Sequence, residues 1–256
     1  MEVESLRQLM DWQPPKVDTI ISGGLLLPQT RLVIYGQWKS WKSMTALHTC
    51  FCLASGTKWF NFGTRESIVL SLQLEIPKAE FRKRVMKYAQ GHNSYPTNLW
   101  FITEHYLKLD RDWGFQALDR AVAMVHPDVV VVDPMYKVLT GHISDPRDMM
   151  GLLDNFDRLI AKYNIALIIV THTRKPGTDE EGRVIDRGAE EMMGSSFLPN
   201  WCDTAVGVRR LSEHSDDIEV SFPLTRNSEE EVKPMTIHIN RSNLKFEHIT
   251  LHHGEA

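Results

Sequence analysis

Apolar runs and amphipathic stretches alternate along the first two thirds of the chain, and this alternation predicts its main elements. Each largely apolar run is six to eight residues long and is bounded by polar or turn-forming residues, as in strands buried on both faces of a parallel sheet. The expected strands span residues 31–36, 67–74, 98–103, 128–133 and 165–171. The stretches between them have apolar residues at helical spacing and predict helices over residues 43–55, 77–90, 113–125 and 145–163. Strands that alternate with helices in this way indicate an α/β fold with a mainly parallel central sheet flanked by helices.

The pattern changes after a long polar stretch at about residues 172–190. A short helix is expected near 191–199, and polar and apolar residues then alternate, which predicts antiparallel strands. These expected strands span residues 204–211, 217–224, 234–240 and 243–250. We find no linker or change in composition that divides the chain. We therefore predict a single domain over residues 1–256, with a lead-in at 1–30, a βα core at 31–203 and a β-rich flank at 204–256.

Composition narrows the class of protein without identifying it. The 256 residues are 42% hydrophobic and 24% charged, which is ordinary for a globular protein, and the net charge is −4. Contact with DNA would therefore have to come from a local patch. The chain has no apolar run of about 18 residues, so we expect no membrane span. Cys50, Cys52 and Cys202 lack paired spacing, which favours free thiols and a cytoplasmic location.

The segment that follows the first expected strand has the character of a phosphate-binding loop. Its sequence fits the pattern G-x-x-x-x-G-K-[ST], except that Trp41 stands where the second glycine belongs. Lys42 would reach the β- and γ-phosphates of ATP, and the Ser43 hydroxyl would bind Mg²⁺. Backbone N–H groups and the helix N-terminus would bind the phosphates. The expected nucleotide-binding residues are Gly36, Gln37, Trp38, Lys39, Ser40, Trp41, Lys42, Ser43 and Met44.

Trp41 leaves two interpretations of this loop. Its Cβ and indole could clash with phosphate or force another path on the backbone. The side chain could instead point outward and leave the backbone amides usable.

Polar residues at the ends of other expected strands suggest the rest of a nucleotide site. Asp133 follows four valines, at the strand end where a carboxylate would hold magnesium through water. Glu75 could orient the attacking water as a general base, or it could be a surface residue that opens a helix. His172 could sense the γ-phosphate, or it could be an ordinary loop histidine. Arg226 could neutralise transition-state charge in a neighbouring subunit, or it could be a surface arginine.

Taken in order along the chain, these motifs resemble those of a known group. The set comprises Gly36–Ser43, Leu74-Glu75 with its basic helix, the strand ending at Asp133, Thr171–Pro176, Gly194–Asp203 and Leu224–Glu230. It resembles the RecA-like P-loop ATPases of the RepA and replicative hexameric helicase group (AAA_25-like), and the resemblance covers most of residues 20–240. It implies a RecA-like P-loop NTPase core with antiparallel strands at the C-terminus, and it implies ATP and Mg²⁺ as ligands.

The resemblance also implies a role for each site residue. Lys42 and Ser43 would be the phosphate-loop residues, Glu75 the catalytic base and Asp133 the magnesium-site acid. His172 would be a sensor, and Arg226 would act in trans on the next subunit.

Assembly and DNA contact are further implications of the resemblance. It implies a hexameric ring or a filament with ATP sites between subunits. It also implies that the loops at about 139–149 and 174–190 face single-stranded DNA, with phosphate contacts from Arg174, Lys175, Arg183 and Arg187. Nearby acidic residues nearly cancel these four charges, so a solvated loop is the alternative.

Three functions remain open at this point. The first is a DNA-dependent ATPase motor, helicase-like, that acts on single-stranded DNA. The second is a RecA-like recombinase or strand-annealing ATPase. The third is a non-catalytic DNA-binding or assembly protein in which Trp41 has closed the phosphate site.

Overall fold

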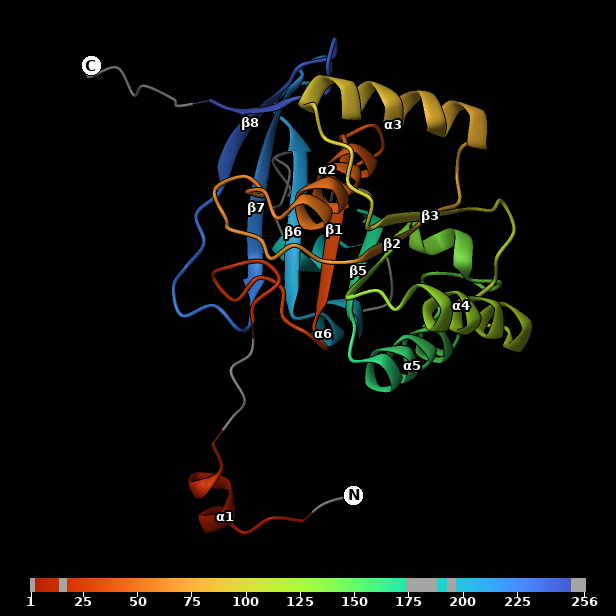
Figure 1. Ribbon diagram of the computed structural model, residues 1–256, viewed down its shortest axis with the longest axis vertical. Helices are drawn as coiled ribbons and strands as arrows, with labels where there is room; N and C mark the ends of the chain where they lie inside the picture. The colour runs from red at the N-terminus through yellow and green to blue at the C-terminus, as the bar shows by residue number, and fades with distance from the viewer. Residues whose placement is uncertain (1–2, 14–17, 174–187, 193–196, 250–256) are drawn as a thin grey trace, which may run out of the picture.

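One mixed β-sheet organises the chain. The computed structural model describes residues 3–13, 18–173, 188–192 and 197–249. Within those residues, nine strands form a sheet in the order β3-β2-β4-β5-β1-β6-β7-β8-β9 (Figure 1). The strands are β1 Arg31–Gly36, β2 Val69–Gln73, β3 Leu99–Thr103, β4 Val129–Asp133, β5 Ala166–His172, β6 Thr204–Arg210, β7 Asp217–Thr225, β8 Met235–Ile239 and β9 Phe246–His248.

Pairing directions confirm the mainly parallel sheet with antiparallel strands at its C-terminal side. Strands β1 to β5 pair in parallel with their neighbours. Strands β7, β8 and β9 pair antiparallel. The first strand of the expected antiparallel set differs, because β6 is parallel to β1 on one side and antiparallel to β7 on the other.

The helices fall within two residues of the positions expected in the βα core. They are α2 Lys42–Ser55, α3 Lys78–His92, α4 Asp112–Val125 and α5 Pro146–Tyr163. The short elements are α1 Leu6–Asp11, α6 Phe197–Trp201, and the 3₁₀ turns η1 Met135–Val138 and η2 Gly188–Glu191. The expected helix near 191–199 is thus α6, displaced toward the C-terminus.

The last expected strand, 243–250, is shorter in the structure. A tight turn occupies its first part, in which the Leu244 N–H donates to Asn240 O at 2.7 Å. Leu244 also has a left-handed φ of 58°, which no strand allows. Pairing therefore begins only at Phe246.

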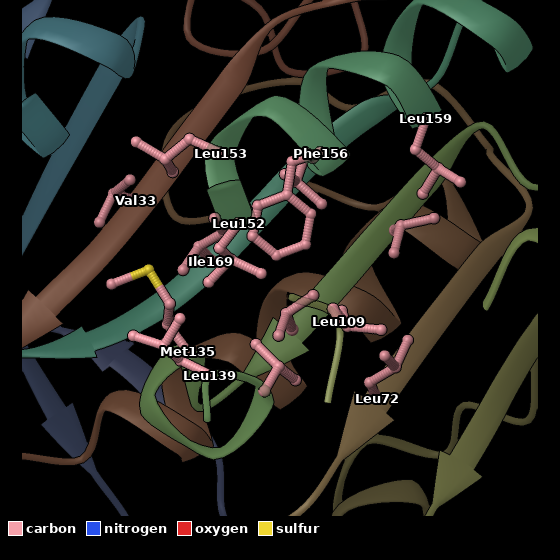
Figure 2. Close-up of a cluster of buried hydrophobic side chains, with 14 of the residues drawn as sticks. Val33, Leu72, Leu109, Met135, Leu139, Leu152, Leu153, Phe156, Leu159 and Ile169 are labelled. Atoms are coloured by element: carbon pink, nitrogen blue, oxygen red, sulfur yellow. The ribbon is translucent and has the colours of Figure 1, made fainter. Parts of the chain in front are cut away.

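Hydrophobic cores lie on both faces of the sheet, as the continuous apolar strands require. Figure 2 shows one of them, where Leu152, Leu153 and Phe156 of α5 pack against Val33 of β1 and Ile169 of β5. Helix α4 joins this face, while α2 covers the opposite face and α3 packs on α2 (Figure 1). No helix in the described ranges is long and apolar enough to cross a bilayer.

Strand register brings the polar strand ends to one edge of the sheet. Gly36 at the end of β1 is opposite His172 at the end of β5, and Gln73 of β2 is opposite Asp133 of β4. Because these strands are parallel, the residues that follow them gather at the same edge. All three cysteines lie elsewhere, buried and free.

Candidate nucleotide-binding site

The loop between β1 and α2 is held close to β6. A Cβ on Gly36 would lie 2.2 Å from the carbonyl oxygen of Val208 and 2.7 Å from Ser40 Oγ, so only glycine fits there. The Gly36 carbonyl accepts a hydrogen bond of 3.0 Å from the Thr173 N–H, just beyond β5. The start of the loop is therefore fixed by strands on both sides.

The amine of Lys42 lies inside the loop. Its Nζ donates to the Gln37 carbonyl and lies 3.5 Å from Ser40 Oγ. Burial lowers the pKa of Lys42 to about 8, against the opposing attraction of Asp133 and Glu75. The loop thus holds a cation that burial leaves poorly solvated and that a phosphate oxygen could stabilise.

Ser43, in the first turn of α2, and Asp133, at the end of β4, lie side by side at this edge of the sheet. The Ser43 hydroxyl donates to Asp133 Oδ1 at 3.1 Å. The pKa of Asp133 is raised to about 6, mainly by burial and also by the Glu75 charge, against the opposing effects of the Ser43 hydrogen bond and the Lys42 charge. A hydroxyl and a carboxylate are oxygen donors of the kind that Mg²⁺ prefers.

The magnesium site would be completed by the nucleotide and by water. Among the described residues, no group of three or more His, Cys, Asp or Glu side chains is arranged to hold a metal ion. Mg²⁺ typically takes one or two protein ligands and fills its remaining positions with phosphate oxygens and water. Ser43 and Asp133 therefore fit a nucleotide-dependent magnesium ion.

Glu75 has a partner that the sequence did not reveal. The Tyr136 hydroxyl, on η1 directly after β4, donates to Glu75 Oε1 at 3.1 Å. Burial and, to a lesser extent, the Glu75 charge together raise the pKa of Tyr136 to about 12, so Tyr136 remains a donor at neutral pH. The Tyr136 ring also lies 5.7 Å from the ring of His172. Burial and the Lys42 charge lower the pKa of His172, which favours the neutral imidazole.

Trp41 has the backbone conformation of a glycine. It precedes α2 with φ 72° and ψ 11°, in the left-handed region. Its ring lies 5.5 Å from the guanidinium carbon of Arg210 and 5.6 Å from that of Arg241. The indole therefore lies against the C-terminal strands, where it is partly buried against the hydrophobic clusters on α2's side of the sheet.

These residues surround one pocket. Its volume is about 570 Å³, within the range of about 300–1,000 Å³ typical of small-molecule sites. Most of the expected loop residues line it, Met44 included, together with Glu75, Asp133 and His172. Five cations that sequence reasoning missed also line it: Lys83, Arg84 and Lys87 of α3, Arg210 and Arg241. The basic helix was visible in the sequence, but nothing there indicated which of its faces meets the loop.

Arg226 lies at the opposite end of the sheet. Its N–H donates to the Asp203 carbonyl, and the Asp203 N–H donates to the carbonyl of Arg31, where β1 begins. The Arg226 guanidinium donates to the Asn200 carbonyl at 2.8 Å. Arg31 and Gly36 are the two ends of β1, which corresponds to a separation of about 16 Å at the usual rise of a strand. The structure therefore does not bring Arg226 to the loop of its own chain.

The four expected DNA-contacting residues, Arg174, Lys175, Arg183 and Arg187, lie outside the described residues.

Comparison with known proteins now identifies the family. The AAA_25 family model, described as an AAA domain, matches residues 2–178. The chain belongs to this family. No curated protein matches it.

Solved structures agree on the fold. One of them, described as an ATPase domain, is 12% identical with a TM-score of 0.65, and the alignment covers 87% of this chain and 86% of that domain. A DnaB-like replicative helicase, solved to show its interactions with primase, is 14% identical with a TM-score of 0.65. That alignment covers 87% of this chain and 58% of the helicase. The RadB recombinase is 18% identical with a TM-score of 0.58, and the alignment covers 87% and 92% of the two chains. The expected RecA-like P-loop ATPase fold is confirmed.

Proposed function

We propose that this protein binds and hydrolyses ATP as an oligomeric, helicase-like motor on single-stranded DNA. The observation that carries the proposal is the meeting of Lys42, the Ser43–Asp133 pair and Glu75 at one pocket. The parallel pairing of β2, β4, β5 and β1, together with the turn from β1 into α2, brings these residues together from three separate parts of the chain.

Each residue then has a part in binding the nucleotide. Lys42 would leave the Gln37 carbonyl and bind the β- and γ-phosphates. Ser43 and Asp133 would hold Mg²⁺, which supplies positive charge next to the phosphates. Because burial raises the pKa of Asp133 only to about 6, its carboxylate is ionised at neutral pH and ready to bind a cation.

Hydrolysis would use Glu75 as the general base. Glu75 would orient a water molecule and accept its proton as the water oxygen attacks the γ-phosphorus and the bond to ADP breaks. The hydrogen bond from Tyr136 would restrict the Glu75 side chain, which is otherwise exposed. His172, neutral and close to the Tyr136 ring, would sense whether the γ-phosphate is present.

The position of Arg226 supports assembly. Arg226 is exposed and lies at the opposite end of β1 from its own loop, so it could complete only the site of a neighbouring subunit. A ring or filament would repeat that contact between successive copies. Charge neutralisation by such an arginine typically accelerates phosphoryl transfer about 10³- to 10⁵-fold.

Single-stranded DNA is proposed from the family resemblance and from the likeness of the fold to a DnaB-like replicative helicase. The fold also resembles that of the RadB recombinase, so the pairing of DNA strands remains a second candidate function. Strand displacement and strand annealing, measured side by side on the same DNA substrates, separate the two functions. Displacement that depends on ATP supports the motor, and annealing without displacement supports the second candidate.

The experiment that tests the proposed activity is an ATP hydrolysis assay with and without single-stranded DNA. We expect hydrolysis by the parent to rise with DNA, and to be lost in Lys42→Ala and Glu75→Gln. Glu75→Gln should still bind ATP, because it leaves the loop intact. Lys58→Ala and Glu66→Gln are the matched controls, since both side chains are exposed and precede β2, at the end of that strand away from the pocket. Undiminished hydrolysis by Lys42→Ala would contradict the site.

A further inference from the structure

Trp41 adopts a backbone conformation that bulky residues rarely adopt. Left-handed φ values are uncommon outside glycine and are costly for a residue with a large side chain. The carbonyl of Trp41 accepts hydrogen bonds of 2.8 Å from the Thr45 N–H and 3.1 Å from Thr45 Oγ1, so this residue is the N-cap of α2. A relaxed Trp41 would therefore alter both the loop and the first turn of the helix.

Two arginines from the C-terminal strands contact the Trp41 ring. Arg210 is the last residue of β6, and Arg241 lies in the turn between β8 and β9. Both guanidinium carbons are within 6 Å of the ring centre, the distance at which cation–π attraction acts. The rest of the indole packs against the hydrophobic clusters on α2's side of the sheet.

The arginines are themselves held by contacts that do not involve the loop. Arg241 Nε donates at 2.7 Å to both carboxylate oxygens of Asp216. One Arg210 nitrogen donates to the Glu213 carbonyl at 2.9 Å. The strands therefore present two oriented cations to a loop residue whose backbone is strained.

We propose that Trp41, Arg210 and Arg241 form a clamp that keeps the phosphate loop in the left-handed conformation a glycine would adopt without help. Arg210 and Arg241 are then positioning residues for ATP binding, acting through Trp41. This inference rests on the proposed function, in which the loop binds ATP. It also explains how a tryptophan can occupy the glycine position, since its ring is used to tie the loop to the C-terminal strands.

A mutant cycle tests the clamp. Arg210→Gln and Arg241→Gln are combined in the parent and in a Trp41→Gly background, and ATP–Mg²⁺ affinity is measured by calorimetry. In the parent background we expect the two arginine substitutions to weaken ATP–Mg²⁺ binding about threefold to tenfold, as for one or two lost cation–π contacts. In the Trp41→Gly background the same pair should change affinity less than about twofold, because glycine needs no clamp. An equal loss in both backgrounds would overturn the proposal, because the arginines would then bind the nucleotide directly.

Thermal unfolding without nucleotide gives a second, independent readout. The arginine pair should lower the melting temperature more in the parent than in the Trp41→Gly background, and equal shifts would overturn the clamp. Trp41→Asn serves if Trp41→Gly folds poorly, because asparagine also tolerates the left-handed region. Arg158→Gln is the matched control, since Arg158 lies 4.6 Å from the Phe115 ring, far from the loop, and should act equally in both backgrounds. If the parent binds no ATP, the proposed function fails, while the unfolding cycle still tests the clamp.

Discussion

Replacing Asp133 with asparagine is expected to stabilise the nucleotide-free protein while abolishing ATP hydrolysis. The carboxyl group is buried, and burial raises its pKa from 3.8 to about 6 even though Lys42 and Ser43 favour the ionised form. Asparagine removes the charge and keeps an oxygen that can accept the Ser43 hydrogen bond. It cannot supply the anionic ligand that magnesium requires, so stability and activity should change in opposite directions.

The size of this stabilisation follows from the difference between the pKa of Asp133 in the unfolded state and its pKa in the folded state. The unfolded chain loses this proton near pH 3.8 and the folded protein near pH 6, so the folded state binds the proton more tightly. The stability that this proton contributes is fully present below pH 3.8 and is lost as the pH rises through 6. At pH 7 the ionised carboxylate therefore costs about 3 kcal/mol, at about 1.4 kcal/mol for each pKa unit. At pH 5 the Asp133 carboxyl is mostly protonated in the folded protein, and the cost falls to about half of its value at pH 7.

Thermal unfolding of parent and Asp133→Asn, without nucleotide, at pH 7 and pH 5 measures this difference. A gain of about 3 kcal/mol corresponds to roughly 6 to 12 °C in melting temperature for a chain of this size. The advantage of the variant should shrink by about half at pH 5. A variant that is less stable than the parent, or whose advantage is the same at both pH values, would refute the reasoning.

Three further substitutions address the geometry of the site. Gly36→Ala places a Cβ against the Val208 carbonyl and should lower the free energy of unfolding by about 1–3 kcal/mol in denaturant titrations; no change would mean that the strands tolerate a wider loop. Tyr136→Phe removes the donor to Glu75 and should lower kcat for ATP about threefold to tenfold with KM nearly constant; a change confined to KM would assign Tyr136 to nucleotide binding instead. Arg226→Ala should bind ATP normally but hydrolyse it at least about 10³-fold more slowly. Mixing it with Glu75→Gln should restore part of the rate, because some mixed sites combine an intact base with an intact arginine; no recovery would argue against action in trans.

Controls for these variants come from equivalent residues outside the site. Tyr106→Phe matches Tyr136→Phe, since Tyr106 is exposed and stacks on Trp113. Arg158→Ala matches Arg226→Ala, because Arg158 is an exposed arginine on α5 that lies over the Phe115 ring and lines no part of the pocket. Neither control should alter kcat.

The fold could be predicted from the sequence because strands that are buried on both faces have continuous apolar sequences. The run 128–133 and the observed β4 Val129–Asp133 agree to one residue, and the polar residue at its end was visible for the same reason. Parallel pairing then brings Asp133 to the edge where β1 ends, which general rules for α/β sheets anticipate. Composition alone would not have placed the loop.

The contacts around the loop could not be predicted in the same way. Arg210 and Arg241 meet Trp41 only because β6 lies beside β1 and the antiparallel strands fold back along that side of the sheet. Periodicity describes which face of an element is buried, and it carries no information about which distant side chains meet. Tyr136 was missed for a related reason, since a 3₁₀ turn after β4 sets its direction toward Glu75.

The central claim is that the loop binds nucleotide although Trp41 replaces its glycine. Calorimetric titration of the parent with ATP in the presence of Mg²⁺, alongside Lys42→Ala, tests it most directly. The account predicts micromolar binding by the parent and a loss of at least about tenfold in Lys42→Ala, about 1.4 kcal/mol or more. Absence of binding by the parent at millimolar ATP, or equal binding by the two proteins, would contradict it.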